Sequence, residues 1–380
     1  MGCNFRENVK LFCFLKVIII LFLFFVHLFF GLLIENVKSR TTAFFLNLSL
    51  FVVIIYFTVG ITYTADWFMY SWIYDKGDDN TDIVFFELSK IFNSLNLEYE
   101  SLYIFHMLGS LIIYWFLISR YTRNYFYVFL LYILLDYVHF TNQIRYYLGL
   151  PILFTGFYYL VYKKKYIFSI FMIILSMLCH AGLATLVLFI PVYFFVPIRK
   201  FIKLSLVSSL VVALIVFLLM KGGLALVLDH YDAYFSSEYD SSLIGGIFNG
   251  LPYMVYYVFI LIETPKLIKK KNIVDHPMYE LLFKLAFFSL LFLPASFFLQ
   301  IIGHRYIMPF AIFWIIFYLY LIQDLPQKQK LFKMVFFGII HFTAIFCIYI
   351  LPDFVLPQNH FMEQVELTIQ SIPYLKDLFF

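Results

Sequence analysis

The chain has 380 residues, of which 63% are hydrophobic and only 13% are Asp, Glu, Lys or Arg. A water-soluble fold of this size cannot cover its surface with so few charges, and the mean hydropathy of +0.90 points the same way. The charges lie in short clusters between apolar runs long enough to cross a bilayer. The composition therefore excludes a soluble protein and predicts an all-α polytopic membrane protein. The net charge of +4 says little about partners; we expect the lipid bilayer and no nucleic acid.

In chain order, the apolar pattern predicts about twelve transmembrane segments, with a range of 10–13. No linker or internal repeat divides them, so residues 1–380 are predicted to form a single membrane domain. The first segment is too long for a signal-peptide core and should remain as an anchor. An alternative for the sixth and seventh segments is a single hairpin that does not fully cross the membrane. The predicted segments are 11–34, 42–61, 101–118, 125–140, 146–162, 166–180, 182–196, 203–220, 251–267, 281–299, 305–322 and 331–351.

The basic residues predict which face of the membrane each connection occupies. Cytoplasmic loops carry an excess of Lys and Arg, and one choice of orientation places 18 of the 27 Lys and Arg residues inside. That choice makes three regions extracytoplasmic, and each is large enough to hold a site. The predicted cytoplasmic connections are 35–41, 119–124, 163–165, 197–203, 263–284 and 323–333, and the large extracytoplasmic regions are 62–100, 221–250 and the tail 352–380.

Two of the outer loops have a distinctive composition. Residues 82–92 show a helical apolar period, which predicts an interfacial helix lying on the membrane. The loop 221–250 interleaves Tyr231, Tyr234 and Tyr239 with acidic residues. Such a loop is typical of a surface that stacks on sugar rings, and equally of an ordinary interfacial aromatic belt.

Arg145 is the most informative candidate, because it stands at the predicted outer start of an apolar helix. A guanidinium beside the free N–H groups of a helix N-terminus forms an anion site. Gly149, one turn later, removes a side chain and would let a ligand approach. The alternative is a snorkelling arginine that marks the membrane boundary. Asn142 and Gln143, just before Arg145, are weaker candidates.

Arg305 repeats this pattern, with His304 beside it and Pro309 placed in the expected first turn of a helix. Two arginines on an otherwise acidic outer face would clamp a pyrophosphate. Alternatively, both are structural and bond to Asp66 or Asp136.

His180, between two apolar runs, and His139, shortly before Arg145, are candidate bases at neutral pH. A lone histidine is as often a hydrogen-bonding residue with no catalytic part. Asp66 is placed either to accept a proton from a sugar hydroxyl or to pair with an arginine. The four cysteines have no metal or disulfide spacing, and no nucleotide-binding or metalloprotease motif is present. We therefore expect no cofactor and no metal.

Taken in chain order, these motifs resemble those of the EpsG family of Wzy-type bacterial polysaccharide polymerases. The resemblance rests on an Asp-then-Tyr loop (Asp66, Tyr70), a helix around Glu87, and the motif that holds Asn142, Gln143 and Arg145. A Lys-rich turn at 163–165 follows, then a run ending at His180, and finally Gly303, Arg305 and Tyr306. The chain departs from the family at Tyr146 and Tyr147, where the family often has Gln and Ala, and at Thr64 and Ala65, where it often has Gly-Thr.

The resemblance implies a GT-C-like membrane fold and an inverting, metal-independent glycosyltransferase of O-antigen, capsule or exopolysaccharide biosynthesis. Its substrates would be undecaprenyl-diphosphate-linked oligosaccharides, with the active site on the extracytoplasmic face of the bacterial cytoplasmic membrane. Arg145 and Arg305 would hold the pyrophosphate, and His180 or His139 would orient or deprotonate the acceptor. Sugar hydroxyls would be bound by Asp66 and Glu87, with Tyr70, Asn142, Gln143, His304 and Tyr306 as further substrate-binding residues. A chain-length regulator and a flippase are possible partners.

Two other functions share these features. A transporter (flippase) of lipid-linked oligosaccharide would need outer arginines, but also polar residues along a path across the membrane, where the cytoplasmic halves are almost wholly apolar. A polysaccharide ligase would use the same arginine chemistry with another acceptor. A non-catalytic scaffold fits the composition and gives no reason for Arg145 and Arg305.

Overall fold

A computed structural model describes the protein over residue 29 and residues 31–77, 82–221, 243–268, 276–352, 367–368 and 370–372. Every regular element in these parts is helical. Seven of the described helical runs are long and apolar enough to cross a membrane. The prediction of an all-α, multi-pass membrane protein is therefore confirmed. Twelve segments and a GT-C-like architecture stay predictions, since the first predicted segment lies largely outside the described residues.

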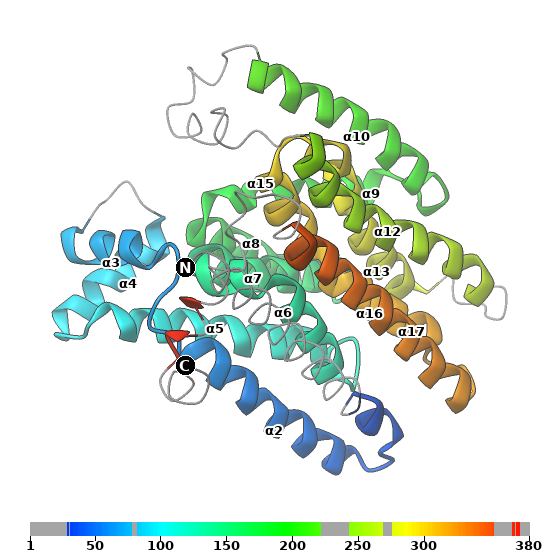
Figure 1. The fold of residues 1–380 in the computed structure, drawn as a ribbon, viewed down its shortest axis with the longest axis horizontal. Coiled ribbons are helices and arrows are strands. Elements are labelled where there is room, and N and C mark those ends of the chain that lie inside the picture. Colours follow the sequence, from blue (N-terminus) through cyan, green and yellow to red (C-terminus); the bar gives the residue numbers. More distant parts are fainter. Residues whose placement is uncertain are drawn as a thin grey trace, which may run out of the picture.

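The first half of the described chain holds most of the helices that build the candidate site (Figure 1). Two short helices, α3 and α4, lie against α5 at one end of the molecule. The predicted interfacial helix corresponds to α4. The helices in order are α2 (Arg40–Val59), α3 (Trp67–Lys76), α4 (Ile83–Ser94), α5 (Tyr99–Ser119), α6 (Tyr125–Asn142), α7 (Ile144–Val161), α8 (Tyr166–Cys179), η1 (Ala181–Leu188), α9 (Phe189–Phe195) and α10 (Ile198–Lys221).

The second half contains interrupted helices. Short 3₁₀ and π turns join α-helical pieces into longer runs, in part where prolines remove a backbone donor. The predicted loop 221–250 lies mostly outside the described residues. The elements are α12 (Leu243–Ile268), α13 (Pro277–Phe288), η4 (Ser289–Phe292), α14 (Leu293–Ser296), α15 (Gln300–Ile302), η5 (Gly303–Ile307), η6 (Met308–Phe310), α16 (Ala311–Ile322), α17 (Gln327–Ile345) and η7 (Phe346–Ile350).

Segments predicted to share a face of the membrane do lie together. At one end, Lys330 pairs with Glu35 and Lys333 with Glu263, all within predicted cytoplasmic connections. At the other end, the Thr62 hydroxyl donates to the Ser371 carbonyl at 2.7 Å, which brings the predicted outer tail beside the first outer loop. We call the end with the Lys330 and Lys333 ion pairs the Lys330 end. The end with the Thr62–Ser371 bond also holds Arg145, and we call it the Arg145 end. These contacts join segments that the charge pattern assigns to one face, and the face of the membrane that each end occupies stays a prediction.

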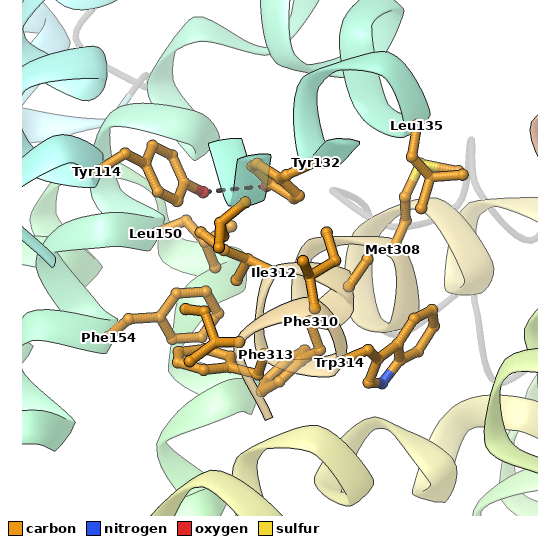
Figure 2. Close-up of a cluster of buried hydrophobic side chains, with 14 of the residues drawn as sticks. Tyr114, Tyr132, Leu135, Leu150, Phe154, Met308, Phe310, Ile312, Phe313 and Trp314 are labelled. Carbon is orange, nitrogen blue, oxygen red and sulfur yellow. Dashed lines mark hydrogen bonds between the residues drawn. The ribbon is translucent and has the colours of Figure 1, made fainter. Parts of the chain in front are cut away.

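The core is aromatic and lies where α5, α6, α7 and α16 meet (Figure 2). Phe154 packs edge-on against Phe310 and Phe313, with ring centroids 5.2 and 4.7 Å away. The buried hydroxyls of Tyr114 and Tyr132 lie 3.0 Å apart and bond to each other. A buried hydroxyl without a partner would be costly. The core therefore forms a rigid platform under the Arg145 end.

The outer surfaces of several helices are apolar, as lipid contact requires. Ile167 of α8 is 89% exposed and Leu210 of α10 is 66% exposed. By contrast, α7 is buried along most of its length. A soluble protein rarely exposes such continuous apolar faces. The central helix is thus shielded by others, and the site residues at its start are supported on every side.

Two local expectations about backbone geometry are corrected. Arg305 does not stand at the start of a helix: the helical run begins at Gln300, and Arg305 lies inside the π turn η5. Pro309, just beyond, has no N–H to donate, so the regular bonding pattern cannot continue through it. Gly149 does not leave room for a ligand either. Its open side faces α8, where an added Cβ would lie 2.9 Å from the Ser176 carbonyl oxygen.

This contact at Gly149 predicts a stability effect. Gly149→Ala should lower stability by about 1–3 kcal/mol, because the methyl group meets α8 backbone that cannot move aside. Gly109→Ala is the matched control: its Cβ would meet the tip of the Leu148 side chain at 3.2 Å. The unfolding temperature in detergent measures both. Equal losses in the two variants would contradict close α7–α8 packing at Gly149.

Candidate functional site

The candidate site is centred on Arg145, the second residue of α7. Its Nη1 lies 3.0 Å from Oδ2 of Asp82, and the two side chains are 15% and 14% exposed. Asp82 immediately precedes α4, so the ion pair joins the α3–α4 region to α7. Neither Asp66 nor Asp136, the partners considered from sequence, makes this ion pair. A partly buried pair is screened far less by salt than a surface pair.

Aromatic rings hold the guanidinium from the other side. The Arg145 Cζ lies 4.9 Å from the ring centroid of Tyr70 and 5.5 Å from that of Phe85. Cation–π contacts of this kind strengthen as water is removed. Burial raises the pKa of the Tyr70 phenol above its usual value, so its hydroxyl stays protonated. Tyr70 and Arg145 were both predicted site residues, and the structure brings them together.

Asp66 and Asn142 form a second contact at this end. The Asp66 N–H donates to Asn142 Oδ1 at 2.6 Å. Asp66 lies within electrostatic range of both Arg305 and Arg145. Burial raises the pKa of the Asp66 carboxyl, while the Asn142 side chain, Arg305 and Arg145 act to lower it. The Asp66 carboxyl is therefore near both arginines but forms an ion pair with neither. Its burial is not offset by such a pair.

Arg305 reaches the same region from the second half of the chain. The Tyr146 hydroxyl donates to the Arg305 backbone carbonyl, which ties η5 to the start of α7. Beside it, Tyr306 stacks on Phe292 with ring centroids 5.0 Å apart. The structure thus brings the two predicted arginines to one end of the molecule. Tyr306 is half-buried against an aromatic neighbour.

His180 caps the N-terminus of η1. Its Nδ1 accepts from the Gly182 N–H at 3.0 Å, and its ring stands edge-on to Tyr146 at 5.3 Å. An accepting Nδ1 carries no proton, so in neutral His180 the proton is on Nε2. The side chain can therefore donate from Nε2. A second proton would have to bind Nδ1, and that would break the capping hydrogen bond from the Gly182 N–H.

His139 and His304 form a stacked pair, with ring centroids 4.1 Å apart and planes tilted by 33°. His304 is only 8% exposed. Neither of its ring nitrogens has a hydrogen-bond partner within the described part of the chain. His139 is half-buried as a residue, and its Nε2 is shielded from solvent. Both were predicted separately; their pairing follows from the packing of η5 beside α6.

Glu87 stands apart from this arrangement, whereas Gln143 lies beside Arg145 at the start of α7. Glu87 is 58% exposed and pairs with Lys90 on its own helix at 3.0 Å, so the structure does not bring it to the arginines. Gln143 is half-buried at the junction of α6 and α7, where its carbonyl accepts from the Tyr147 N–H. The other predicted residues lie at the Arg145 end.

Two acidic residues were not among the predicted site residues. Asp82 is one of several acids in the predicted outer loop 62–100 and begins the predicted helix 82–92, and no local signal marks it as the partner of Arg145. Asp136, considered from sequence only as a structural partner, is fully buried and accepts from the Tyr147 hydroxyl at 2.6 Å. An ionisable group at such a depth is expensive, and this hydrogen bond satisfies one oxygen of the carboxyl.

The arrangement suits the binding of an anionic group next to a hydroxyl-rich ligand. Two guanidinium groups supply positive charge, while Asp66, Asn142 and Tyr70 supply polar contacts beside them. His180 lies within electrostatic range of both arginines, and His139 within range of Arg305. A bundle of membrane-length helices that carries these two arginines at one end defines a multi-pass membrane protein.

Comparison with known proteins gives its family. The model of the EpsG family matches residues 45–362, most of the chain, so the protein belongs to the EpsG family. Membership indicates a polysaccharide polymerase-type role. Searches of curated proteins and of solved structures each found no match.

Asp66 generates a pH-dependent prediction. A carboxyl with a raised pKa stabilises the fold fully below its usual pKa, near 3.8, and this contribution is lost as pH rises through the raised value. Asp66→Asn should therefore raise the unfolding temperature in detergent at about pH 7.5, with a gain that shrinks toward about pH 4. Asp75→Asn, which removes the same charge from an exposed position of α3, is the control. A gain that grows on acidification would contradict the assignment.

Proposed function

We propose that the protein is a polymerase that joins undecaprenyl-diphosphate-linked oligosaccharide repeat units into a surface polysaccharide. It transfers the growing chain from its lipid carrier to a new lipid-linked unit and releases the lipid diphosphate. The observation that carries this proposal is the setting of Arg145 in a chain of the EpsG family. Its guanidinium contacts Asp82 and the Tyr70 ring, and Arg305 lies nearby.

The chemical step is a displacement at the anomeric carbon of the growing chain. The acceptor hydroxyl oxygen forms the new glycosidic bond as the bond between that carbon and the phosphate oxygen breaks. Inversion follows from attack opposite the leaving group. Negative charge grows on the departing diphosphate, and fixed guanidinium groups of Arg145 and Arg305 stabilise it more in the transition state than in the ground state. The positive charge comes from side chains, so the reaction needs no metal.

The proton of the acceptor hydroxyl goes to a base, and His139 suits this role better than His180. The Nδ1 of His180 is already occupied by the Gly182 N–H, so His180 is placed to orient a ligand through Nε2. His139 is half-buried and stacks on His304, which has no bonded partner in the described part of the chain. Asp66 and Asn142 bind sugar hydroxyls beside it.

The polymerase proposal is tested with protein purified in detergent and lipid-diphosphate-linked repeat units as substrate. Wild type should give a ladder of products on a gel, and the ladder should be lost in Arg145→Ala and in Arg145→Lys, since a lysine cannot form the same two-pronged contact. Arg120→Ala is the control, because Arg120 lies on the surface over the Phe116 ring at the Lys330 end. Chelator should leave the ladder unchanged.

Other results would redirect the proposal. A ladder that survives Arg145→Ala would keep the polymerase and reject this active site. No ladder with the native substrate would favour transport of lipid-linked oligosaccharide or ligation of finished chains. Loss of the ladder in chelator would contradict the metal-free mechanism.

The roles of the histidines are separable by kinetics. His139→Gln should lower turnover about 10²- to 10⁴-fold, the usual contribution of a general base. His180→Asn should lower it less. His276→Asn is the matched control: the Nδ1 of His276 accepts from the Met278 N–H at 3.2 Å, the same capping bond, at the start of α13. A larger loss in His180→Asn than in His139→Gln would assign the base to His180.

A further inference from the structure

The carboxylate of Asp82 has two bonds that together describe an anion site. Its Oδ2 lies 3.0 Å from Arg145 Nη1, and its Oδ1 accepts from the Ala181 N–H at 3.1 Å. The Ala181 N–H belongs to the first residue of η1, a helix of eight residues. A helix N-terminus and a guanidinium both favour negatively charged oxygens. In this structure, the anion that satisfies both donors is a side chain of the protein itself.

We propose that Asp82 is an internal stand-in for a phosphate of the lipid diphosphate, and that the Ala181 N–H is part of the phosphate site. When substrate binds, phosphate oxygens replace the two carboxylate oxygens on Arg145 and on the start of η1. Asp82 then leaves, and the first turn of α4 is released from α7 and η1. This inference rests on the proposed function. It adds the Ala181 N–H as a phosphate-binding group and Asp82 as a residue that competes with the phosphate.

The geometry accounts for the need for such a stand-in. Arg145 is 15% exposed and lies against the Tyr70 and Phe85 rings. A guanidinium in that position without a counter-charge would be costly to desolvate. Asp82 supplies the charge between turnovers and keeps the guanidinium oriented. The consequence is competition: phosphate binds only to the fraction of molecules in which Asp82 has moved away, which weakens its apparent affinity by that fraction.

Inorganic pyrophosphate is the probe, because it carries the charged part of the substrate and measures binding without polymerisation. Asp82→Asn keeps an oxygen for the Ala181 N–H but removes the competing charge. It should bind pyrophosphate about tenfold more tightly than wild type in calorimetry. Asp75→Asn removes the same charge from an exposed position on α3 and should bind as wild type does. Arg145→Ala should bind least.

A second measurement uses unaltered protein. Adding pyrophosphate to wild type should speed backbone hydrogen exchange over residues 82–86, because the start of α4 loses its link to Arg145 and Ala181. Exchange over residues 327–345, at the Lys330 end, should not change. This readout does not depend on whether Asp82→Asn folds well.

The outcomes separate the inference from the proposed function. Equal or weaker binding in Asp82→Asn, with binding still lost in Arg145→Ala, would overturn the stand-in and leave the polymerase site intact; Asp82 would then serve to position Arg145. Slower exchange at 82–86 with pyrophosphate would overturn it too. If wild type and all variants fail to bind pyrophosphate, both the stand-in and the phosphate role of Arg145 are wrong.

Discussion

The ion pair between Arg145 and Asp82 is the interaction on which the rest of the site depends. It joins the start of α4 to the start of α7, and through the Ala181 N–H it also reaches η1. These three points are distant in sequence and are brought together at one end of the bundle. The pair is partly buried, so water and salt screen it weakly. A positive charge can persist there at the edge of an apolar protein because its counter-charge is built in.

The aromatic core explains how this charged end is held still. Helix α7 is buried along most of its length, and its close approach to α8 at Gly149 fixes where Arg145 and His180 lie relative to each other. Below them, Phe154 packs on the rings of η6 and α16 (Figure 2). Closely packed rings resist displacement. Preorganised charge stabilises a transition state without the cost of moving protein dipoles, so closely packed rings beneath the arginines suit the proposed phosphate site.

The second arginine comes from a very different local structure. Arg305 lies in a π turn, and the Tyr146 hydroxyl holds its backbone carbonyl. Tyr146 is one of the positions where the chain departs from the common family pattern. The departure thus has a structural meaning: a tyrosine there links the two arginine-bearing segments. The same π turn carries His304, which places a histidine pair within the reach of the site.

The sequence by itself determined that the protein is an all-helical, multi-pass membrane protein, and it singled out most of the polar residues that the structure brings to the Arg145 end. These follow from local properties: apolar length, the charges of each connection, and polar side chains in apolar surroundings. Arg145 at a helix start and His180 between two runs needed no knowledge of the fold. The family resemblance, confirmed over residues 45–362, rests on the same local motifs.

Only the tertiary structure decided which of these residues meet. Asp82 is one of several acids in its loop, and nothing local distinguishes it as the partner of Arg145. Glu87, on the same helix, turns outward because successive positions of a helix face different directions. The π turn at Arg305 and the contact of Gly149 with α8 also depend on neighbouring segments. Pairing between distant segments is a property of packing, and a pattern along one chain does not contain it.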